Sequence, residues 1–294
     1  MADEQARQPS WRQGATWAIA ALVLAGMYWD VGAYFAQRWL QEDTYHHCLF
    51  VPPVVGWLIW RRRETLSQLT PRADWRGLFV LGGGALLYVV AMRVGVRVAI
   101  GFSFPIVLAG LVWTGLGLGF LRHLLYPLIL LLFVVPVPKH IMGHFGMPLQ
   151  VTSAAGAARI AHLLGLPVIH DGINLTLNGH TYVIAEQCSG LNSLLALLFA
   201  AAVLVEVMNV RAAGRFILLT APAVVLAGNV VRLVSVLIFA EFAGPQFAMD
   251  SLVHGGSDII VYLAAFSFMW LLIDLVSERR MVAIILGRES HRKE

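Results

Sequence analysis

Three side chains in the second half of the chain have the chemical types that acyl transfer requires. Cys188 offers a thiol, His254 an imidazole and Arg232 a guanidinium. A thiolate can attack a carbonyl carbon, an imidazole can accept and return the proton, and a cation can stabilise the oxyanion that forms. Each residue type alone is common, so the hypothesis depends on whether the fold brings the three together.

Arg232 lies within a long apolar segment, three residues after Asn229. An arginine in the middle of a membrane span costs about 2.5–3.5 kcal/mol or more, and such a residue usually has a function and a partner. Its apolar stem could also carry the charge to the membrane surface, but the end of the segment is about ten residues, or about 15 Å of helix, away. We therefore predict a functional cation, with Asn229 on the same helix face.

Cys188 comes just before another apolar segment, and Ser189 is a suitable N-cap residue for a helix there. A helix N-terminus favours the thiolate form of a cysteine. The local sequence leaves two other interpretations open, which are a buried packing thiol and a disulfide with Cys48.

His254 stands at the start of the last apolar segment, four residues before Asp258. If the helix has begun by that point, Asp258 lies one turn away and can orient the imidazole. Alone, His254 would be an ordinary histidine at a membrane interface.

The composition places these residues in a membrane protein. The 294 residues are 59% apolar and only 13% charged, whereas a soluble domain carries about 25% charged residues. The mean hydropathy of +0.74 also excludes an ordinary soluble enzyme. We predict one all-α, multi-pass membrane domain over residues 1–294 with about eight transmembrane helices. The expected spans are 16–36, 48–60, 77–92, 98–120, 124–137, 189–207, 216–242 and 256–276.

The distribution of basic residues predicts the orientation. With the N-terminus inside, the inner segments hold fifteen of the 21 Lys and Arg residues and the outer segments hold five. The positive-inside rule then predicts that both termini are cytoplasmic. Cys188, Arg232 and His254 fall at the same outer depth in this topology. The net charge of +4 therefore reflects topology and does not indicate a nucleic-acid partner.

One stretch, residues 138–187, does not read as a membrane span. Residues 146–164 are typical of a helix at or near the outer surface. Residues 173–184 alternate around Asn178-Gly179, which predicts a β-hairpin with a type I′ turn. We expect this stretch to form a small cap on the outer face, and the hairpin leads directly into Cys188.

Other motifs favour packing over chemistry. The glycines of residues 115–119 and 82–84 lack the strand that a nucleotide loop needs and predict close helix packing. His46, His47 and Cys48 resemble a metal corner, but the other outer histidines have no paired spacing and zinc needs three or four ligands. We expect no bound metal and no cofactor.

The sequence resembles the exosortase/archaeosortase family of polytopic membrane transpeptidases. The likeness rests on Glu186-Gln-Cys188-Ser189-Gly-Leu, then Asn229-Val-Val-Arg232, then His254. It extends over about residues 124–266, and Pro148-Leu-Gln150 and the segment ending in Trp60-Arg-Arg-Arg63 are also similar. Many members carry Arg where this chain has Asn192, and Asp where it has Gly255.

The resemblance implies a sortase-like cysteine peptidase or transpeptidase. Cys188, Arg232 and His254 would be catalytic, with Glu186, Ser189, Asn229 and Asp258 in support. The substrate would be a secreted protein whose C-terminus has a short motif, typically Pro-Glu-Pro, then a hydrophobic helix and a basic tail. An acyl-enzyme would pass the protein to a lipid or polysaccharide acceptor outside the cytoplasmic (inner) membrane of a prokaryote, in connection with exopolysaccharide export.

Three other functions compete with this enzyme. A transporter or channel subunit would place charges near the midplane and use inverted repeats, and no repeat is visible in the sequence. Another type of intramembrane protease would need a zinc motif or an aspartate pair, and neither pattern is apparent. A structural subunit of a polysaccharide export system remains the simplest alternative.

Overall fold

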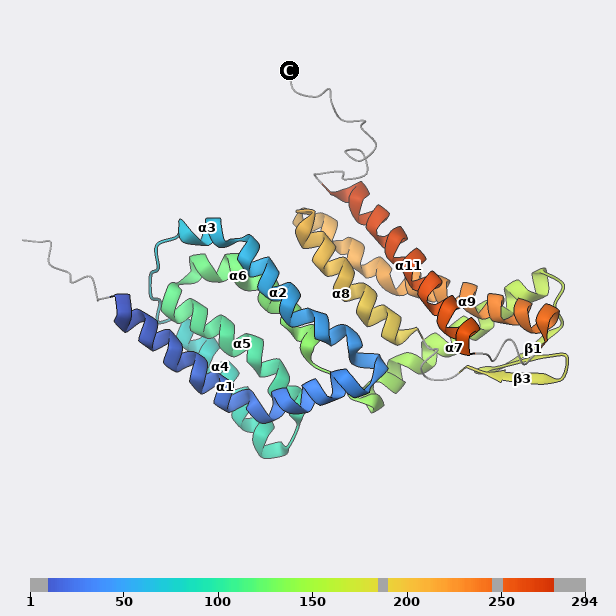
Figure 1. Ribbon diagram of the computed structural model, residues 1–294, viewed down its shortest axis with the longest axis horizontal. Coiled ribbons are helices and arrows are strands. Elements are labelled where there is room, and N and C mark those ends of the chain that lie inside the picture. The colour runs from blue at the N-terminus through green and yellow to red at the C-terminus, as the bar shows by residue number, and fades with distance from the viewer. Residues whose placement is uncertain (1–9, 185–189, 245–250, 278–294) are drawn as a thin grey trace, which may run out of the picture. The chain divides into compact units, whose positions relative to one another are not determined.

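The computed structural model describes residues 10–184, 190–244 and 251–277, and Figure 1 shows them as helices with one small sheet. The elements of the first half are α1 (Ser10–Gln41), the 3₁₀ helix η1 (Asp43–Phe50), α2 (Val51–Arg61), α3 (Arg63–Ser67), α4 (Gly77–Val94), α5 (Arg97–Leu116), α6 (Leu118–Leu130) and the 3₁₀ helix η2 (Leu131–Val134). The second half contains α7 (Lys139–Leu163), β1 (Val168–Asp171), β2 (Asn174–Leu177), β3 (His180–Val183), α8 (Leu191–Val207), the 3₁₀ helix η4 (Ala212–Thr220), α9 (Ala221–Ala243) and α11 (Ser251–Val276).

The predicted helical, multi-pass class is confirmed. Within the described ranges, five helical segments are long and apolar enough to cross a membrane. Two shorter apolar segments, Leu118–Val134 and Leu191–Val207, accompany them. The five longer segments are Gly14–Gln41, Gly77–Val94, Arg97–Leu116, Gly214–Ala243 and Ile259–Val276.

The chain divides after Pro136 into two compact units. In the first unit, α4 and α5 pack closely because glycines lie between them. A Cβ atom added at Gly84 would meet the Val107 side chain at 2.9 Å, and additions at Gly77 and Gly110 would collide with the backbones of Thr114 and Leu81. The predicted role of glycine in close packing is thus confirmed at Gly84, while Gly82 and Gly83 have no neighbour within 4 Å.

Several predicted spans of the first unit have different boundaries in the structure. The expected span 124–137 corresponds to α6 and η2, which begin at Leu118 and end at Val134. The expected helix 98–120 ends at Leu116, because Gly117 has φ +95° and α6 begins immediately after it. Its neighbour Gly115 instead lies against the Trp17 ring. The expected span 48–60 begins with 3₁₀ turns, so the α-helical part of this stretch is the eleven residues of α2.

The second unit contains the predicted hairpin within a three-stranded antiparallel sheet of order β1-β2-β3. Asn178 and Gly179 have φ of +51° and +80°, which confirms the expected type I′ geometry. Strand β1 was not predicted, and it joins β2 through a second tight turn at Gly172, where φ is +60°.

Helix α7 is longer than the predicted helix 146–164 and begins at Lys139. Its alanine face is buried within the unit, because Ala154, Ala157 and Ala161 are fully covered. They share one core with residues of α9 and with the inward face of the sheet, represented by Leu175 and Leu177. The predicted cap is therefore part of the second unit, and α7 packs against the buried face of the sheet.

Helices α8, η4, α9 and α11 form the other core of this unit. Leu197, Val205, Val225, Met269 and Ile273 lie at its centre. At one end of it the Arg215 guanidinium lies 3.5 Å from the Glu206 carboxylate. The candidate site lies toward the opposite end of these helices, where α8 begins.

Candidate active site

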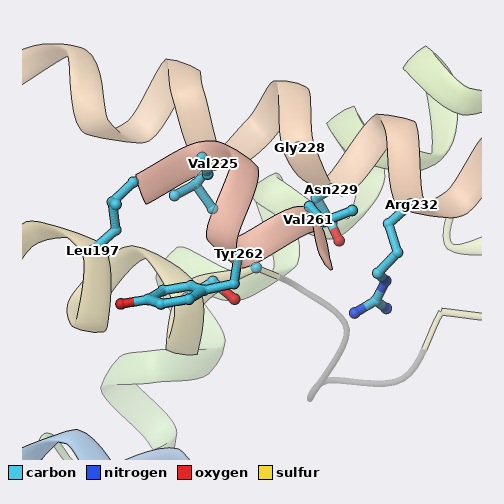
Figure 2. Close-up of a pocket in the computed structure, with 10 residues that line it drawn as sticks. Leu197, Val225, Gly228, Asn229, Arg232, Val261 and Tyr262 are labelled. Atoms are coloured by element: carbon cyan, nitrogen blue, oxygen red, sulfur yellow. The ribbon is translucent and has the colours of Figure 1, made fainter. Parts of the chain in front are cut away.

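Arg232 and Asn229 are both buried in α9. Their exposed fractions are 8% and 5%, which are low for polar residues. Three positions along the helix separate them, so they lie one turn apart, and Figure 2 shows the Arg232 side chain extending away from the helix axis beyond Asn229. This burial distinguishes Arg232 from a merely interfacial arginine, which would hold its charge in water, and its function stays a prediction.

A hydrogen bond from another helix holds Asn229. Its amide Nδ2 donates to Ser153 Oγ at 2.9 Å, and Ser153 of α7 is fully buried. This bond fixes the side-chain rotamer of Asn229 and leaves little freedom at the neighbouring turn of α9. Sequence analysis missed Ser153, because a single serine in an alanine-rich helix carries no signal of which face it occupies.

The start of α8 packs directly against Asn229. Gly190 is the N-cap residue of α8 and has φ +79°, a conformation that favours glycine. A Cβ atom added there would lie 3.2 Å from Val225 Cγ1 and 3.6 Å from Asn229 Cβ and Cγ. The segment that follows Cys188 in sequence is therefore anchored on the face of α9 that carries Asn229.

A small cavity lies where α8, α9 and α11 meet. Its volume is about 30 Å³, enough for about one water molecule. Arg232 and Asn229 contribute polar groups to it, and Figure 2 shows Tyr262 of α11 on the opposite side. Its lining residues are Gly190, Ser193, Leu197, Val225, Gly228, Asn229, Arg232, Val261, Tyr262 and Ala265.

Two contacts give the alignment of α9 against α11. Thr220, the N-cap residue of α9, has its Oγ1 3.7 Å from Met269 Sδ. Further along, a Cβ atom on Gly228 would meet Val261 Cγ1 at 3.1 Å. Position 228 is eight residues after 220, and position 261 is eight residues before 269. The two helices are therefore antiparallel, and the two contacts are separated by the same number of residues on each.

This alignment, extended along the two helices, predicts that the backbone around His254 lies near the level of Arg232. Continued by four residues, it sets Arg232 level with position 257 of α11. His254 lies three residues from that level, or about 4.5 Å along the helix axis. Because α11 begins at Ser251, His254 and Asp258 are one helical turn apart on it, as the sequence required for a pair. The side chains of residues 251–258 are outside the described set.

The end of the sheet is also tied to α7. Gln150 is 4% exposed, and its Nε2 donates to the Ile184 carbonyl oxygen at 3.5 Å. Ile184 is the last described residue before the segment that holds Cys188. The predicted site residues Glu186, Cys188 and Ser189 lie outside the described residues.

The residues that resemble a metal corner, His46, His47 and Cys48, lie in η1, in the other unit. Cys48 is 1% exposed, and its Sγ is 3.6 Å from His47 Nε2. No group of three or more possible metal ligands occurs among the residues that the structure describes.

Taken together, the membrane-crossing helices and the polar groups buried where three of them meet define a multi-pass membrane protein with an enclosed polar site. The sequence matches the transmembrane exosortase family over residues 39–271, and the chain belongs to that family. A transpeptidase-like role in the membrane follows from this membership. No curated protein and no solved structure matches the chain.

Proposed function

We propose that this exosortase is a cysteine transpeptidase with Cys188, Arg232 and His254 as its catalytic residues. The observation that carries the proposal is the contact of Gly190 with Asn229, one turn from the buried Arg232. Cys188 precedes Gly190 by two residues, so chain connectivity keeps their Cα atoms within about 7.6 Å. The alignment of α9 with α11 supports the inclusion of His254.

The reaction uses these groups in two steps. The Cys188 thiolate forms a C–S bond to the scissile carbonyl while its proton rests on His254, and Arg232 stabilises the oxyanion. The C–N bond then breaks, and the departing amine takes the proton from the imidazolium. In the second step an amine or hydroxyl of the acceptor loses its proton to His254 and displaces the thiolate from the thioester.

Four neighbours support the catalytic residues. Asn229, held by Ser153, keeps the Arg232 turn in place and can hydrogen-bond the same substrate. Asp258 orients the imidazole from one turn away on α11. The N-cap residue of α8 is Gly190 and not Ser189, as the sequence had suggested; Ser189 and Glu186 belong to the polar segment around Cys188.

The substrates are secreted proteins with a C-terminal sorting signal. The signal consists of a short motif of the Pro-Glu-Pro type, a hydrophobic helix and a basic tail. We place the enzyme in the inner membrane of a prokaryote, with both termini cytoplasmic and the active site on the outer side. The acceptor is a lipid or polysaccharide, and the reaction accompanies exopolysaccharide export. The charge distribution and the family support this assignment.

A tripartite reporter tests the proposal. It is a secreted domain followed by Pro-Glu-Pro, an apolar helix and an arginine tail, co-expressed with the full-length enzyme. Removal of the tail is measured as a decrease in the mass of the reporter. Cys188→Ala should abolish processing, whereas Cys48→Ala, the same change at the other cysteine, should leave it intact. Processing by Cys188→Ala at the wild-type rate would exclude a cysteine mechanism.

The same reporter tests His254 and Asp258 separately. His254→Ala should abolish turnover, and Asp258→Asn should lower kcat strongly with little change in KM, because the carboxylate acts through the imidazole. If His254→Ala is inactive and Asp258→Asn is normal, His254 acts without an orienting acid. If His254→Ala retains full activity, the proposed proton transfer is wrong.

A further inference from the structure

Among the described residues, strand β3 pairs along one edge only. The sheet order is β1-β2-β3, so within the described part of the chain β3 pairs only with β2. The Ile184 N–H donates to the Ile173 carbonyl oxygen at 3.0 Å. Because backbone groups alternate in direction along an antiparallel strand, the N–H and C=O groups of Thr181 and Val183 point to the other edge.

This edge lacks the features by which proteins usually block strand pairing. Edge strands are commonly protected by lysine, proline, a bulge or a covering element. The sequence of β3 is His-Thr-Tyr-Val, which favours strand formation and contains no lysine or proline, and its register with β2 has no bulge. Thr181 is exposed, and Val183 is 63% exposed. At the other edge of the sheet, β1 lies against α7.

The edge is also held rigidly. At the hairpin turn, Asn178 Nδ2 donates to Glu241 Oε2 of α9 at 2.6 Å. Across the two strands, the hydroxyls of Thr176 and Thr181 are 2.9 Å apart. The opposite face of the hairpin is fixed by burial of its leucines in the core shared with α7 and α9. A preformed edge costs little ordering entropy when a partner binds.

We propose that the free edge of β3 binds an extended segment of the protein substrate as a fourth strand of the sheet. This inference rests on the proposed function, which makes a peptide the substrate. The chain itself argues for this occupant. Val183 is five residues before Cys188, a stretch that spans at most about 17 Å. A peptide paired to β3 is therefore held within reach of the thiol.

Strand addition explains how one site can accept many proteins. The main chain of the peptide provides the hydrogen bonds, so affinity depends little on its side chains, and only alternate side chains face a surface of the enzyme. These bonds are equally present in the bound substrate and in the transition state. Their loss should therefore raise KM and leave kcat unchanged.

Paired proline substitutions test the edge. Thr181→Pro removes an outward N–H without breaking the β2–β3 ladder. His170→Pro is the matched control. Asp171 pairs with Asn174 next to the turn, and because N–H groups alternate in direction along a strand, the N–H of His170 points away from β2. With the tripartite reporter, Thr181→Pro should raise KM about tenfold, equivalent to about 1.4 kcal/mol, at unchanged kcat. An unchanged KM, or an equal change in His170→Pro, would overturn the proposal.

Disulfide trapping decides the matter even if a proline variant folds poorly. In full-length enzyme with Cys188→Ala and Cys48→Ala, Thr181→Cys is combined with single cysteines at successive positions of the reporter around its motif. Strand pairing predicts cross-linking at every second position, and Ile169→Cys on β1 should give none. Uniform cross-linking, or an enzyme dimer linked through position 181, would contradict it. Processing of the reporter by the wild-type enzyme, which retains Cys188, is measured separately. The strand-pairing proposal can therefore be wrong while the proposed function stands.

Discussion

At the scale of single residues, the burial of Arg232 is the most informative feature. An arginine that is 8% exposed in an apolar helix is costly, and the fold retains it beside a second buried polar residue, Asn229. The guanidinium holds its N–H donors in a fixed plane, so two of them can donate to one carbonyl oxygen, and a lysine ammonium cannot reproduce this geometry. In the proposed mechanism this geometry stabilises the oxyanion.

Arg232→Lys tests that role. The variant keeps the positive charge, so it should insert and fold, but turnover of the reporter should fall about 10²–10³-fold, the usual effect of losing one oxyanion donor. The measurement is kcat at matched protein level, and the exposed Arg159→Lys on α7 serves as the control. Near-normal turnover of Arg232→Lys would reduce the residue to a structural role.

At the scale of elements, the start of α8 determines where the nucleophile segment lies. Gly190 combines φ +79° with close packing on α9, so both its backbone and its lack of a side chain are needed. Gly190 therefore both starts α8 and sets the distance between the Cys188 segment and Asn229.

Gly190→Ala should damage the site from this position. A side chain in the left-handed region costs about 1–2 kcal/mol, and the new Cβ would press on Val225 Cγ1 at 3.2 Å. We expect the free energy of unfolding to fall by about that amount and processing to slow roughly tenfold. Gly82→Ala in α4, where nothing lies within 4 Å, is the control. Equal behaviour of the two variants would contradict the packing argument.

A second element-scale prediction concerns the connection between α3 and α4. The Asp74 carboxylate accepts hydrogen bonds from the Arg76 backbone N–H at 3.0 Å and from Trp113 Nε1 at 2.9 Å. These bonds, with the Arg76 bond the larger effect, lower the pKa of Asp74. Its contribution to stability is therefore present above the pKa of the unfolded chain and is lost as pH falls through the folded value.

Melting temperatures measured from pH 6 down to pH 3 check this. The wild type should lose part of its advantage over Asp74→Asn as the carboxylate protonates, below about pH 4. The two proteins should converge at the acid end. A constant difference across the range would show that the hydrogen bonds of Asp74 are not responsible.

The sequence predicted those features that depend on local chemistry. Asn178-Gly179 gave the turn because both positions need positive φ, and the apolar segments gave the helices. The break at Gly117 was missed because a glycine within an apolar run reads equally well as packing. Ser153 was missed because its importance lies in a tertiary hydrogen bond to Asn229, which no pattern along the chain records.

At the scale of the whole molecule, the account requires a defined orientation in the membrane. The proposed site can meet secreted proteins only if the sheet and the start of α8 face outward. The charge distribution predicts this arrangement, because the predicted spans leave fifteen basic residues on the side of the termini and five on the other.

Labelling with a membrane-impermeant thiol reagent tests the orientation. Cysteines are introduced singly at Ile169, which is 70% exposed on β1, and at Ser290 near the C-terminus, in a background without Cys48 and Cys188. In intact cells whose outer envelope is permeable to the reagent, only position 169 should be labelled. In lysed cells both positions should be labelled. Labelling of position 290 alone in intact cells would reverse the topology and exclude an outward-facing site.

The central claim is that the substrate becomes covalently attached to Cys188, and trapping the intermediate tests it most directly. Enzyme stopped by acid during turnover of the tripartite reporter is digested and analysed by mass spectrometry. We predict a peptide containing Cys188 that carries the new C-terminus of the reporter as a thioester, and hydroxylamine should remove it. An enzyme that processes the reporter while Cys188 remains unmodified under these conditions, or a reporter adduct on another residue, would contradict the account.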